Sequence, residues 1–479
     1  MNSTAHPRVT SSVRRITRRA LLALASLWLV TYSEAQTSTD APPPGAESVY
    51  LSKPMETTYD ARLRMDYQFR AQDNQQESDL YNYFSGGVHN TAGGWLDVYM
   101  SGMTYQDLSR HPDSSSLATN MFAGLDDANG VRDFRLFQLY GDIHDPDGNV
   151  HLDVGRQYLD VADYILVDGG QLLLFENELM GGRMFYGKPV SFYTSQEDDT
   201  AYGLSLVGRP WDGNRTRLTY AHVSSSQGTN DANYFVDSQQ IFSDTVRGRV
   251  QASMMNGDFR MMRSDCYYFA PDGKTDAALG VSRWGSYDAA TLAYSPLYDV
   301  LGKQDPYSYA YARFSQEVFT HIILSPGISW RQADGSSVSY NNQDYRDYDL
   351  TLTYEPIKEF SASISGHYWD LDSSNFLGVD GELCYRYDRQ VEFSLGTSYV
   401  QYSYVTYSDI SYVSDGFGGL VASDGLSTGR ESPNSYTYFL RARWKINRNL
   451  TFRVEGDVED DSASSSLGYS ARASIEASL

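Results

Sequence analysis

Strict alternation of apolar and polar residues dominates this chain, and it is clearest between Tyr59 and Arg70. In this stretch the odd positions are all apolar or aromatic, and the even positions are all charged or amide. Because successive side chains of a strand leave on opposite faces, a period of two predicts a β-strand. Such a run of charged and amide groups suits a barrel wall that is apolar outside and wet inside. The stretch therefore predicts a transmembrane β-barrel.

The connections between such strands alternate between short and long. Short turns are predicted at 90–93, 145–148, 176–178, 209–214, 256–257, 319–320, 356–358, 389–390 and 447–449, and longer connections include 106–131, 225–245, 271–306, 332–345 and 407–434. This rhythm predicts an all-β, antiparallel transmembrane barrel of about 20 strands, within a range of roughly 18 to 22, because one missed hairpin changes the count by two. Short turns are expected on the periplasmic side, long loops outside, and both chain ends on the turn side.

The strands on either side of the turn at 447–449 predict a specific contact. Apolar side chains share one face of both strands, and charged side chains share the other. A three-residue turn places Arg441 opposite Glu455, which is a favourable cross-strand pair. The final segment, 469–479, alternates in the same way and ends in the apolar residue Leu479.

The first 35 residues have the features of an export signal. Five arginines between Arg8 and Arg19 precede the apolar run 20–30, and Ser33-Glu34-Ala35 precedes Gln36 as a cleavage site. The apolar run is shorter than the roughly 20 residues of a membrane helix. The predicted organisation is a signal peptide at 1–35, a proline-containing periplasmic leader at 36–56 and an outer-membrane β-barrel at 57–479.

Together, the signal, the alternation, the turn rhythm and the last strand resemble a bacterial outer-membrane porin across nearly all of 57–479. Members of that family usually end in phenylalanine, and Leu479 departs from this pattern. The resemblance identifies no subfamily. It implies a location in the bacterial cell outer membrane, contact with outer-membrane lipid, and recognition of the last strand by the barrel-assembly machinery.

Charge and motifs exclude several functions. The formal charge is −23, and loss of the first 35 residues leaves 33 basic and 60 acidic residues, or −27. Nucleic acid is therefore excluded as a partner. The sequence has no G-x-S-x-G, H-E-x-x-H, P-loop or C-x-x-C-H motif, so we expect no enzyme, catalytic residue, metal site or cofactor. The two cysteines, Cys266 and Cys384, are expected to be inert wall residues, with a single disulfide bridge as the alternative.

The charged face gives the candidate site. On the five strands with the clearest alternation, ten basic and six acidic side chains face inward, a local charge of +4. The predicted pore-lining residues are Arg62, Arg64, Arg70, Arg247, Arg249, Arg260, Arg441, Arg443, Lys445, Arg453, Glu455 and Asp457. One interpretation is that they solvate a wide wall and neutralise one another. The other is a track that attracts anions or stacks against sugars, because the arginine fork pairs with carboxylate and phosphate.

The predicted function is passive passage of small hydrophilic solutes, anions among them. Barrels of 16 to 18 strands already hold an aqueous channel, whereas those of 22 strands carry a plug. A barrel of intermediate width needs narrowing, so the loop at 271–306, with its apolar patch at 289–298, is expected to fold inward. The alternative function is a sheath around an exported multihaem cytochrome in an electron conduit, which fits the wide lumen, the 39 tyrosines and the lack of a haem motif.

Overall fold

The structure is a computed structural model that describes residues 56–479 except 73–74, 110–131, 146–147, 161–163, 176–178, 191–198, 226–229, 286–305, 335–343, 372–373, 409–411, 415–419, 423–426, 463 and 465. The predicted signal peptide and nearly all of the predicted leader lie outside these residues and stay predictions. No helix in the described residues is long and apolar enough to cross a bilayer.

The described elements are all strands. In chain order they are β1 (Thr58–Gln72), β2 (Gln75–Thr91), β3 (Leu96–Asp107), β4 (Arg132–His144), β5 (Val150–Asp160), β6 (Tyr164–Leu174), β7 (Met180–Pro189), β8 (Thr200–Gly208), β9 (Asn214–Ser224), β10 (Asn230–Ile241), β11 (Val246–Met255), β12 (Asp258–Phe269), β13 (Thr275–Trp284), β14 (Tyr307–Phe319), β15 (Ile322–Ala333), β16 (Tyr345–Ile357), β17 (Phe360–Leu371), β18 (Asn375–Tyr387), β19 (Val391–Ser408), β20 (Tyr412–Ser414), β21 (Leu420–Ala422), β22 (Ser427–Glu431), β23 (Asn434–Lys445), β24 (Leu450–Asp461) and β25 (Gly468–Ser478).

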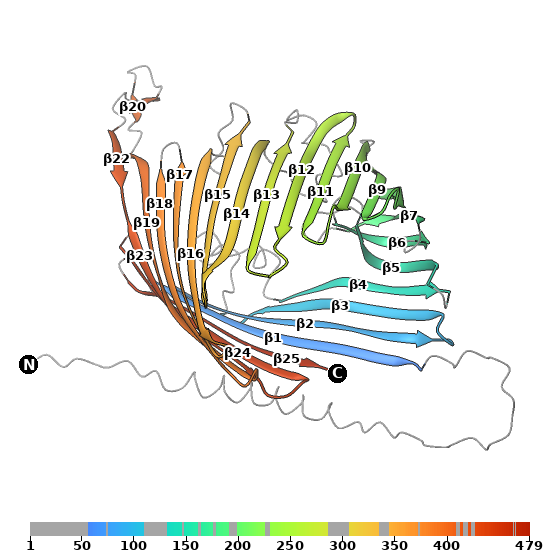
Figure 1. Ribbon diagram of the computed structural model, residues 1–479, viewed down its shortest axis with the longest axis horizontal. Helices are drawn as coiled ribbons and strands as arrows, with labels where there is room; N and C mark the ends of the chain where they lie inside the picture. Colours follow the sequence, from blue (N-terminus) through green and yellow to red (C-terminus); the bar gives the residue numbers. More distant parts are fainter. Residues whose placement is uncertain are drawn as a thin grey trace, which may run out of the picture. The chain divides into compact units, whose positions relative to one another are not determined.

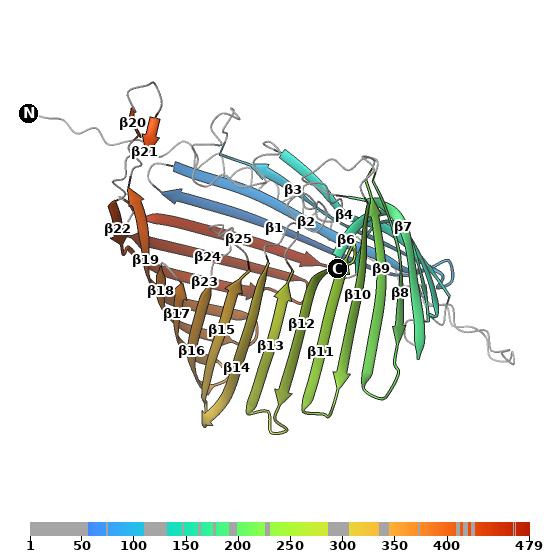
Figure 2. The ribbon, with the colours of Figure 1, turned by 90° about the horizontal axis from the view of Figure 1, so that it is seen from above.

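Antiparallel pairing of neighbours closes these strands into a barrel. Strands β1 to β19 pair in chain order, β19 pairs with β23, and β25 pairs with β1 from Arg62↔Ser478 to Ala71↔Tyr469. The wall therefore has 22 strands, and its first and last strands lie side by side (Figures 1 and 2). Strand β22 extends the pairing of β19 beyond the wall, and β20 pairs only with β21. The predicted all-β barrel is confirmed, at the upper limit of the predicted strand range.

The two faces of the wall have opposite character. Large apolar side chains cover the outer face, and examples near mid-strand are Leu440, Leu395 and Ile364, each more than half exposed. Leu395 and Leu440 are direct partners across β19 and β23, while the alternate positions carry arginines and carboxylates that pair inside the barrel. A closed barrel satisfies every backbone group of its wall, and an apolar outer face suits lipid. These features confirm the predicted location in the outer membrane.

Two strands lie in segments that the sequence predicted as loops. Strand β10 occupies most of 225–245, and β13 occupies part of 271–306. The reason lies in the turn at Asn256 and Gly257, which is a two-residue turn with positive φ at both positions, 53° and 92°. It lies at the long-loop end of the barrel, so assigning it to the short-turn end shifted the alternation of turns and loops and hid two strands. The apolar patch at 289–298 lies outside the described residues.

A buried apolar core lines part of the inner wall. Its members are Leu159, Ile165, Val167, Phe185, Ala201, Ala221, Val223 and Met255. Strand pairings such as Leu159↔Ile165 and Ala201↔Val223 place them on the inner face of β5 to β11. The lumen is therefore not uniformly polar, and its charged side chains are concentrated elsewhere.

The turn between β4 and β5 is organised by Asp145. Its carbonyl oxygen accepts the Gly148 N–H at 2.9 Å, and its carboxylate accepts the N–H groups of Val150 and Asn149, both at 2.7 Å. Gly148 takes the left-handed conformation that such a turn requires, with φ of 69°. The Val150 amide, followed by the Asn149 amide, lowers the pKa of the Asp145 carboxyl.

This turn should make barrel stability depend on pH. The Asp145 carboxyl has a lower pKa in the folded barrel than in the unfolded chain. Its ionised form therefore adds to the free energy of unfolding at pH values above the unfolded pKa of about 3.9, and this contribution is lost as the pH falls through the folded pKa. Asp145→Asn is therefore expected to lower the urea midpoint at neutral pH. The difference from the wild type should vanish in strong acid. If Asp145→Asn lowered the urea midpoint by the same amount at neutral pH and in strong acid, this role for the carboxylate would be contradicted.

Candidate functional site on the inner wall

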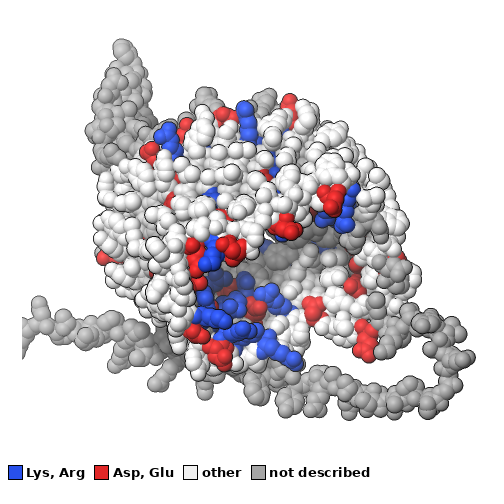
Figure 3. All heavy atoms as spheres, in the orientation of Figure 1, with Lys and Arg blue, Asp and Glu red and all other residues white. Residues whose placement is uncertain are grey.

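Side chains of the first and last strands gather around a hollow of about 510 Å³ on the inner wall. Five arginines line it, Arg64, Arg441, Arg443, Arg453 and Arg472, together with the carboxylates Asp66, Glu382, Glu392 and Glu455. We call these nine residues the seam cluster, because they extend from the junction of β1 with β25 across β24, β23 and β19 to β18. Figure 3 shows basic and acidic side chains together inside a hollow of the molecule. The cluster has a formal charge of +1.

Period two and strand register bring the seam cluster together. Arg441 is the direct partner of Glu455, and Arg443 is the direct partner of Arg453, across β23 and β24. On the other side of β23, Arg443 faces Glu392 of β19. A one-residue slip of either pairing would turn these side chains toward lipid.

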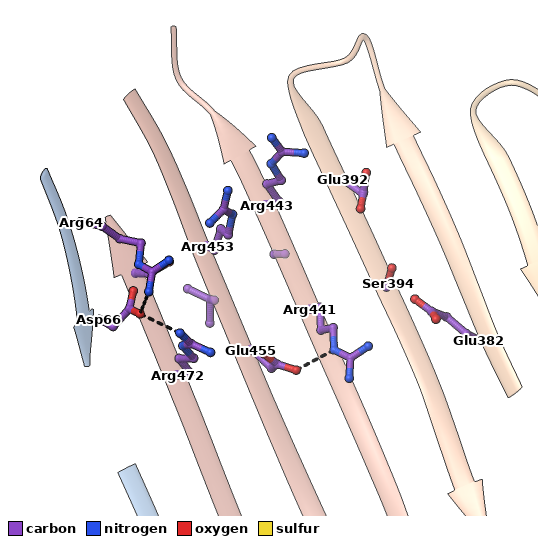
Figure 4. Close-up of a pocket in the computed structure, with 13 residues that line it drawn as sticks. Arg64, Asp66, Glu382, Glu392, Ser394, Arg441, Arg443, Arg453, Glu455 and Arg472 are labelled. Carbon is purple, nitrogen blue, oxygen red and sulfur yellow. Dashed lines mark hydrogen bonds and ion pairs between the residues drawn. The ribbon is translucent and has the colours of Figure 1, made fainter. Parts of the chain in front are cut away.

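Ion pairs hold one part of the cluster. Asp66, which is 1% exposed, accepts from Arg472 at 2.6 Å and from Arg64 at 3.0 Å. Glu455 accepts from Arg441 Nε at 2.7 Å, as predicted from the turn at 447–449. The Arg472 contact joins β25 to β1 across the seam, and the Arg441 contact joins β23 to β24 (Figure 4).

The other part of the cluster is less neutralised. Arg453 lies 3.5 Å from Glu476, a carboxylate outside the cluster that also pairs with Arg62 at 2.9 Å, so two arginines share it. Arg443 makes no ion pair within the part of the chain that the structure describes, and its head group lies near that of Arg453 (Figure 4). A positive edge therefore remains, where an arginine fork is available to an anion.

A second basic cluster lies on β7, β9, β10 and β11, together with the last residue of β5. Arg183, Arg215, Arg217 and Arg249 surround a hollow of about 150 Å³ with the carboxylates Asp160 and Asp237, and we call these six residues the β9 cluster. Asp237 pairs with Arg249 at 2.8 Å, and Asp160 pairs with Arg217 at 2.7 Å. Four arginines and two carboxylates leave a formal charge of +2. Both clusters are therefore positive in a chain whose total charge is −23.

The contact between Asp160 and Arg217 joins distant parts of the wall. Strands β5 and β9 are four strands apart, and neighbouring strands lie about 4.8 Å apart, so the path along the wall is roughly 19 Å. Arg217 nevertheless donates to both carboxylate oxygens of Asp160 and to its carbonyl, at 2.7 to 3.2 Å. The end of β5 therefore reaches the inner face of β9 directly, which shows that the wall bends sharply between these two strands.

The predicted site residues fall into two groups. Nine of them, Arg62, Arg64, Arg70, Arg441, Arg443, Lys445, Arg453, Glu455 and Asp457, lie on β1, β23 and β24 beside the seam. The other three lie about ten strands away, Arg247 and Arg249 on β11 and Arg260 on β12. Arg70 pairs with Glu77 at 2.8 Å, and Asp457 accepts from Ser470 at 2.7 Å. The structure thus brings together the first group and leaves the second apart from it.

A bulge explains the position of Arg260. Ser253 pairs with Met261 and Met254 pairs with Phe259, which leaves Arg260 between two paired positions. The residue is 3% exposed, and its guanidinium lies 5.7 Å from the ring centre of Trp284. After the bulge, the odd-numbered residues of β12 face the lumen. Arg263 and Asp265 therefore face inward, although the sequence pattern did not select them.

Other inward residues were missing from the prediction. Arg472 and Glu476 belong to the alternation of the last strand, and that alternation was a signal that could have selected them. The β9 cluster residues Arg183, Arg215 and Arg217 lie on short strands whose alternation is interrupted by small residues. No local pattern places Asp160 beside Arg217.

The described residues contain no group of three or more histidine, cysteine, aspartate or glutamate side chains placed to hold a metal ion. Both cysteines are free. Cys266 lies on the outer face of β12, and Cys384 shares the inner face of β18 with Glu382. The alternative of a bridge between them is therefore wrong for one barrel, because the wall separates the two sulfur atoms.

Comparison with known proteins gives structural similarity alone. No family model matches the sequence, and no curated protein matches it. The chain is similar to the crystal structure of Pseudomonas aeruginosa OccK9 (OpdG), with 11% identity, a TM-score of 0.45, and coverage of 89% of this chain and 99% of that one. The chain is also similar to a BenF-like porin from Pseudomonas fluorescens Pf-5, with 11% identity, a TM-score of 0.44, and coverage of 88% of this chain and 98% of that one. A third similar structure is P. aeruginosa OccK2 (OpdF) in complex with glucuronate, with 8% identity, a TM-score of 0.43, and coverage of 88% of this chain and 96% of that one.

Proposed function

We propose that this protein is an outer-membrane channel through which small hydrophilic solutes pass passively, with anions favoured. The observation that carries the proposal is the seam cluster, where a hollow of about 510 Å³ is lined by five arginines and four carboxylates. A charged, hydrated inner face inside an apolar wall suits the passage of polar solutes across lipid. The twelve residues predicted to line the pore retain that role as part of this proposal, except Arg260, which is buried at the bulge of β12.

Local charge supports the preference for anions. The seam cluster carries +1 and the β9 cluster carries +2. Carboxylates in the turns and loops are screened beyond about 8 Å at physiological salt, so a solute in the lumen responds mainly to the wall beside it. Rings of basic side chains are one way in which pores select anions.

A cytochrome sheath remains the alternative predicted from the sequence. Nothing in the described part of the chain favours it.

Single-channel recording tests the proposal. Purified barrel added to a planar lipid bilayer is expected to produce discrete conductance steps, and liposomes containing it are expected to swell in small organic anions. A folded barrel that gives neither steps nor swelling would contradict the channel function.

A further inference from the structure

A row of aromatic side chains lines the inner face at the long-loop end of β13 to β19. Its members are Trp284, Tyr307, Tyr345, Trp369, Phe376 and Tyr402, and we call them the aromatic belt. Pairings such as Trp284↔Tyr307, Trp369↔Phe376 and Phe376↔Tyr402 connect them from strand to strand.

The belt is nearly continuous. Ring centres are 6.4 Å apart for Trp284 and Tyr307, 5.7 Å for Tyr345 and Trp369, 5.5 Å for Trp369 and Phe376, and 5.2 Å for Phe376 and Tyr402. Strand β15 contributes Arg331, whose guanidinium lies 4.1 Å from the ring centre of Tyr307. The rings of Tyr345 and Trp369 are stacked, with 12° between their planes, whereas those of Phe376 and Tyr402 meet at 67°. Seven neighbouring strands therefore present one mostly aromatic surface to the lumen.

The membrane does not explain this surface. Aromatic residues on the outer face collect at the lipid interface, and the stacked pair Tyr348 and Tyr368 is such a pair. The belt lies on the opposite face of the same strands, because Phe376 shares its face of β18 with Glu382 of the seam cluster. Trp369 and Tyr402 are 42% and 43% exposed on this inner face. A large exposed aromatic surface in an aqueous lumen indicates a binding surface.

Polar groups next to the belt limit the ligand chemistry. A hollow of about 360 Å³ beside Trp284 and Tyr307 is also lined by Arg263 and Asp265, which pair with each other at 2.7 Å. Tyr311 reaches across Gly280, where a side chain would meet its ring, and donates to Asp265 at 2.8 Å. The arginines here are already engaged, so the site offers mixed donors and acceptors beside aromatic faces, with its positive charge balanced.

We propose that the aromatic belt is a binding track for neutral oligosaccharides built of pyranose rings. A pyranose has flat faces lined with C–H groups that pack on aromatic rings, and hydroxyls at its edge that exchange hydrogen bonds with groups such as Asp265 and Arg263. An aromatic acid would also stack, but it needs an uncompensated cation, and the nearest partly neutralised arginines belong to the seam cluster. Six residues of β18 separate Phe376 from Glu382, which is roughly 20 Å.

The track deepens the proposed channel function and rests on it, since it adds a neutral class of hydrophilic solute to the anions that the basic clusters favour. A linear sugar could bind successive rings and enter the lumen end-on. The solute would then pass from an aromatic surface to a charged one.

The test uses maltohexaose and two matched double variants. Tyr345→Ala with Trp369→Ala removes two belt rings from β16 and β17, while Tyr348→Ala with Tyr368→Ala removes a stacked pair from the outer face of the same strands. Maltohexaose is expected to block the wild-type current. Its binding should weaken about tenfold in the inner variant, and stay unchanged in the outer one, with equal sugar-free conductance in all three.

Other outcomes separate this inference from the channel function. Conductance steps without any block by maltohexaose would overturn the track and leave the channel intact. The track would also be overturned if both double variants lost the block by maltohexaose to the same extent. It would be overturned as well if the belt slowed the passage of benzoate while maltohexaose had no effect on the current. If the barrel does not conduct, calorimetric binding of maltohexaose to detergent-solubilised protein, weakened only in the inner variant, would support the track alone.

Discussion

Ile364→Arg is expected to lower the free energy of unfolding by roughly 2 to 4 kcal/mol, whereas Ser363→Arg, one residue earlier, should change it little. Ile364 lies near the middle of β17 on the outer face, is 53% exposed, and is the direct partner of Leu352. An arginine there would place a charge in hydrocarbon. Ser363 lies on the inner face opposite Glu382, so the same side chain would be hydrated and would gain a favourable partner.

Urea unfolding of both variants in lipid vesicles measures this difference. The two variants carry the same new residue on the same strand at nearly the same depth in the membrane, so they differ mainly in the face of the wall that carries the arginine. Similar losses for both variants would mean that the inner and outer faces have been assigned wrongly.

Arg443→Glu combined with Arg453→Glu is expected to reverse the ion preference of the channel. These two arginines are direct partners on β23 and β24, and together with Glu392 they form the positive edge of the seam cluster. The double change converts a formal charge of +1 at the hollow into −3 without introducing a new bulky group. Cations should then be favoured at low salt, with the preference fading as salt screens the wall.

A matched control carries the same change of charge outside the lumen. Lys358 and Arg389 are exposed in the turns after β16 and β18, so Lys358→Glu with Arg389→Glu alters the total charge equally. This variant should keep the wild-type preference. Equal shifts in both double variants would show that total charge, and not the wall of the hollow, determines selectivity.

The sequence predicts the seam well because local rules determine it. A three-residue turn at 447–449 sets the register of β23 and β24, and period two then sets the face, so Arg441 meets Glu455 at 2.7 Å as predicted. No information from distant parts of the chain is needed for that contact. The contact between Arg472 and Asp66 is different, because it joins residues 406 positions apart and depends on how the last strand closes against the first.

Elsewhere the local rules are insufficient. Asn256 and Gly257 are the residues of a tight hairpin, but nothing in them indicates at which end of the barrel the turn lies, and two strands were missed as a result. The bulge at Arg260 reverses the phase of β12 without a signal in the hydrophobic pattern. The contact between Asp160 and Arg217 joins residues 57 positions apart, so only the closed fold shows it.

The reversal potential of the wild-type channel in a gradient of potassium chloride tests the central claim most directly. If the basic clusters of the inner wall determine what passes, the potential at low salt will have the sign of an anion-selective pore and will move toward zero as both salt concentrations rise. A clear cation preference that persists at every salt concentration would contradict the account.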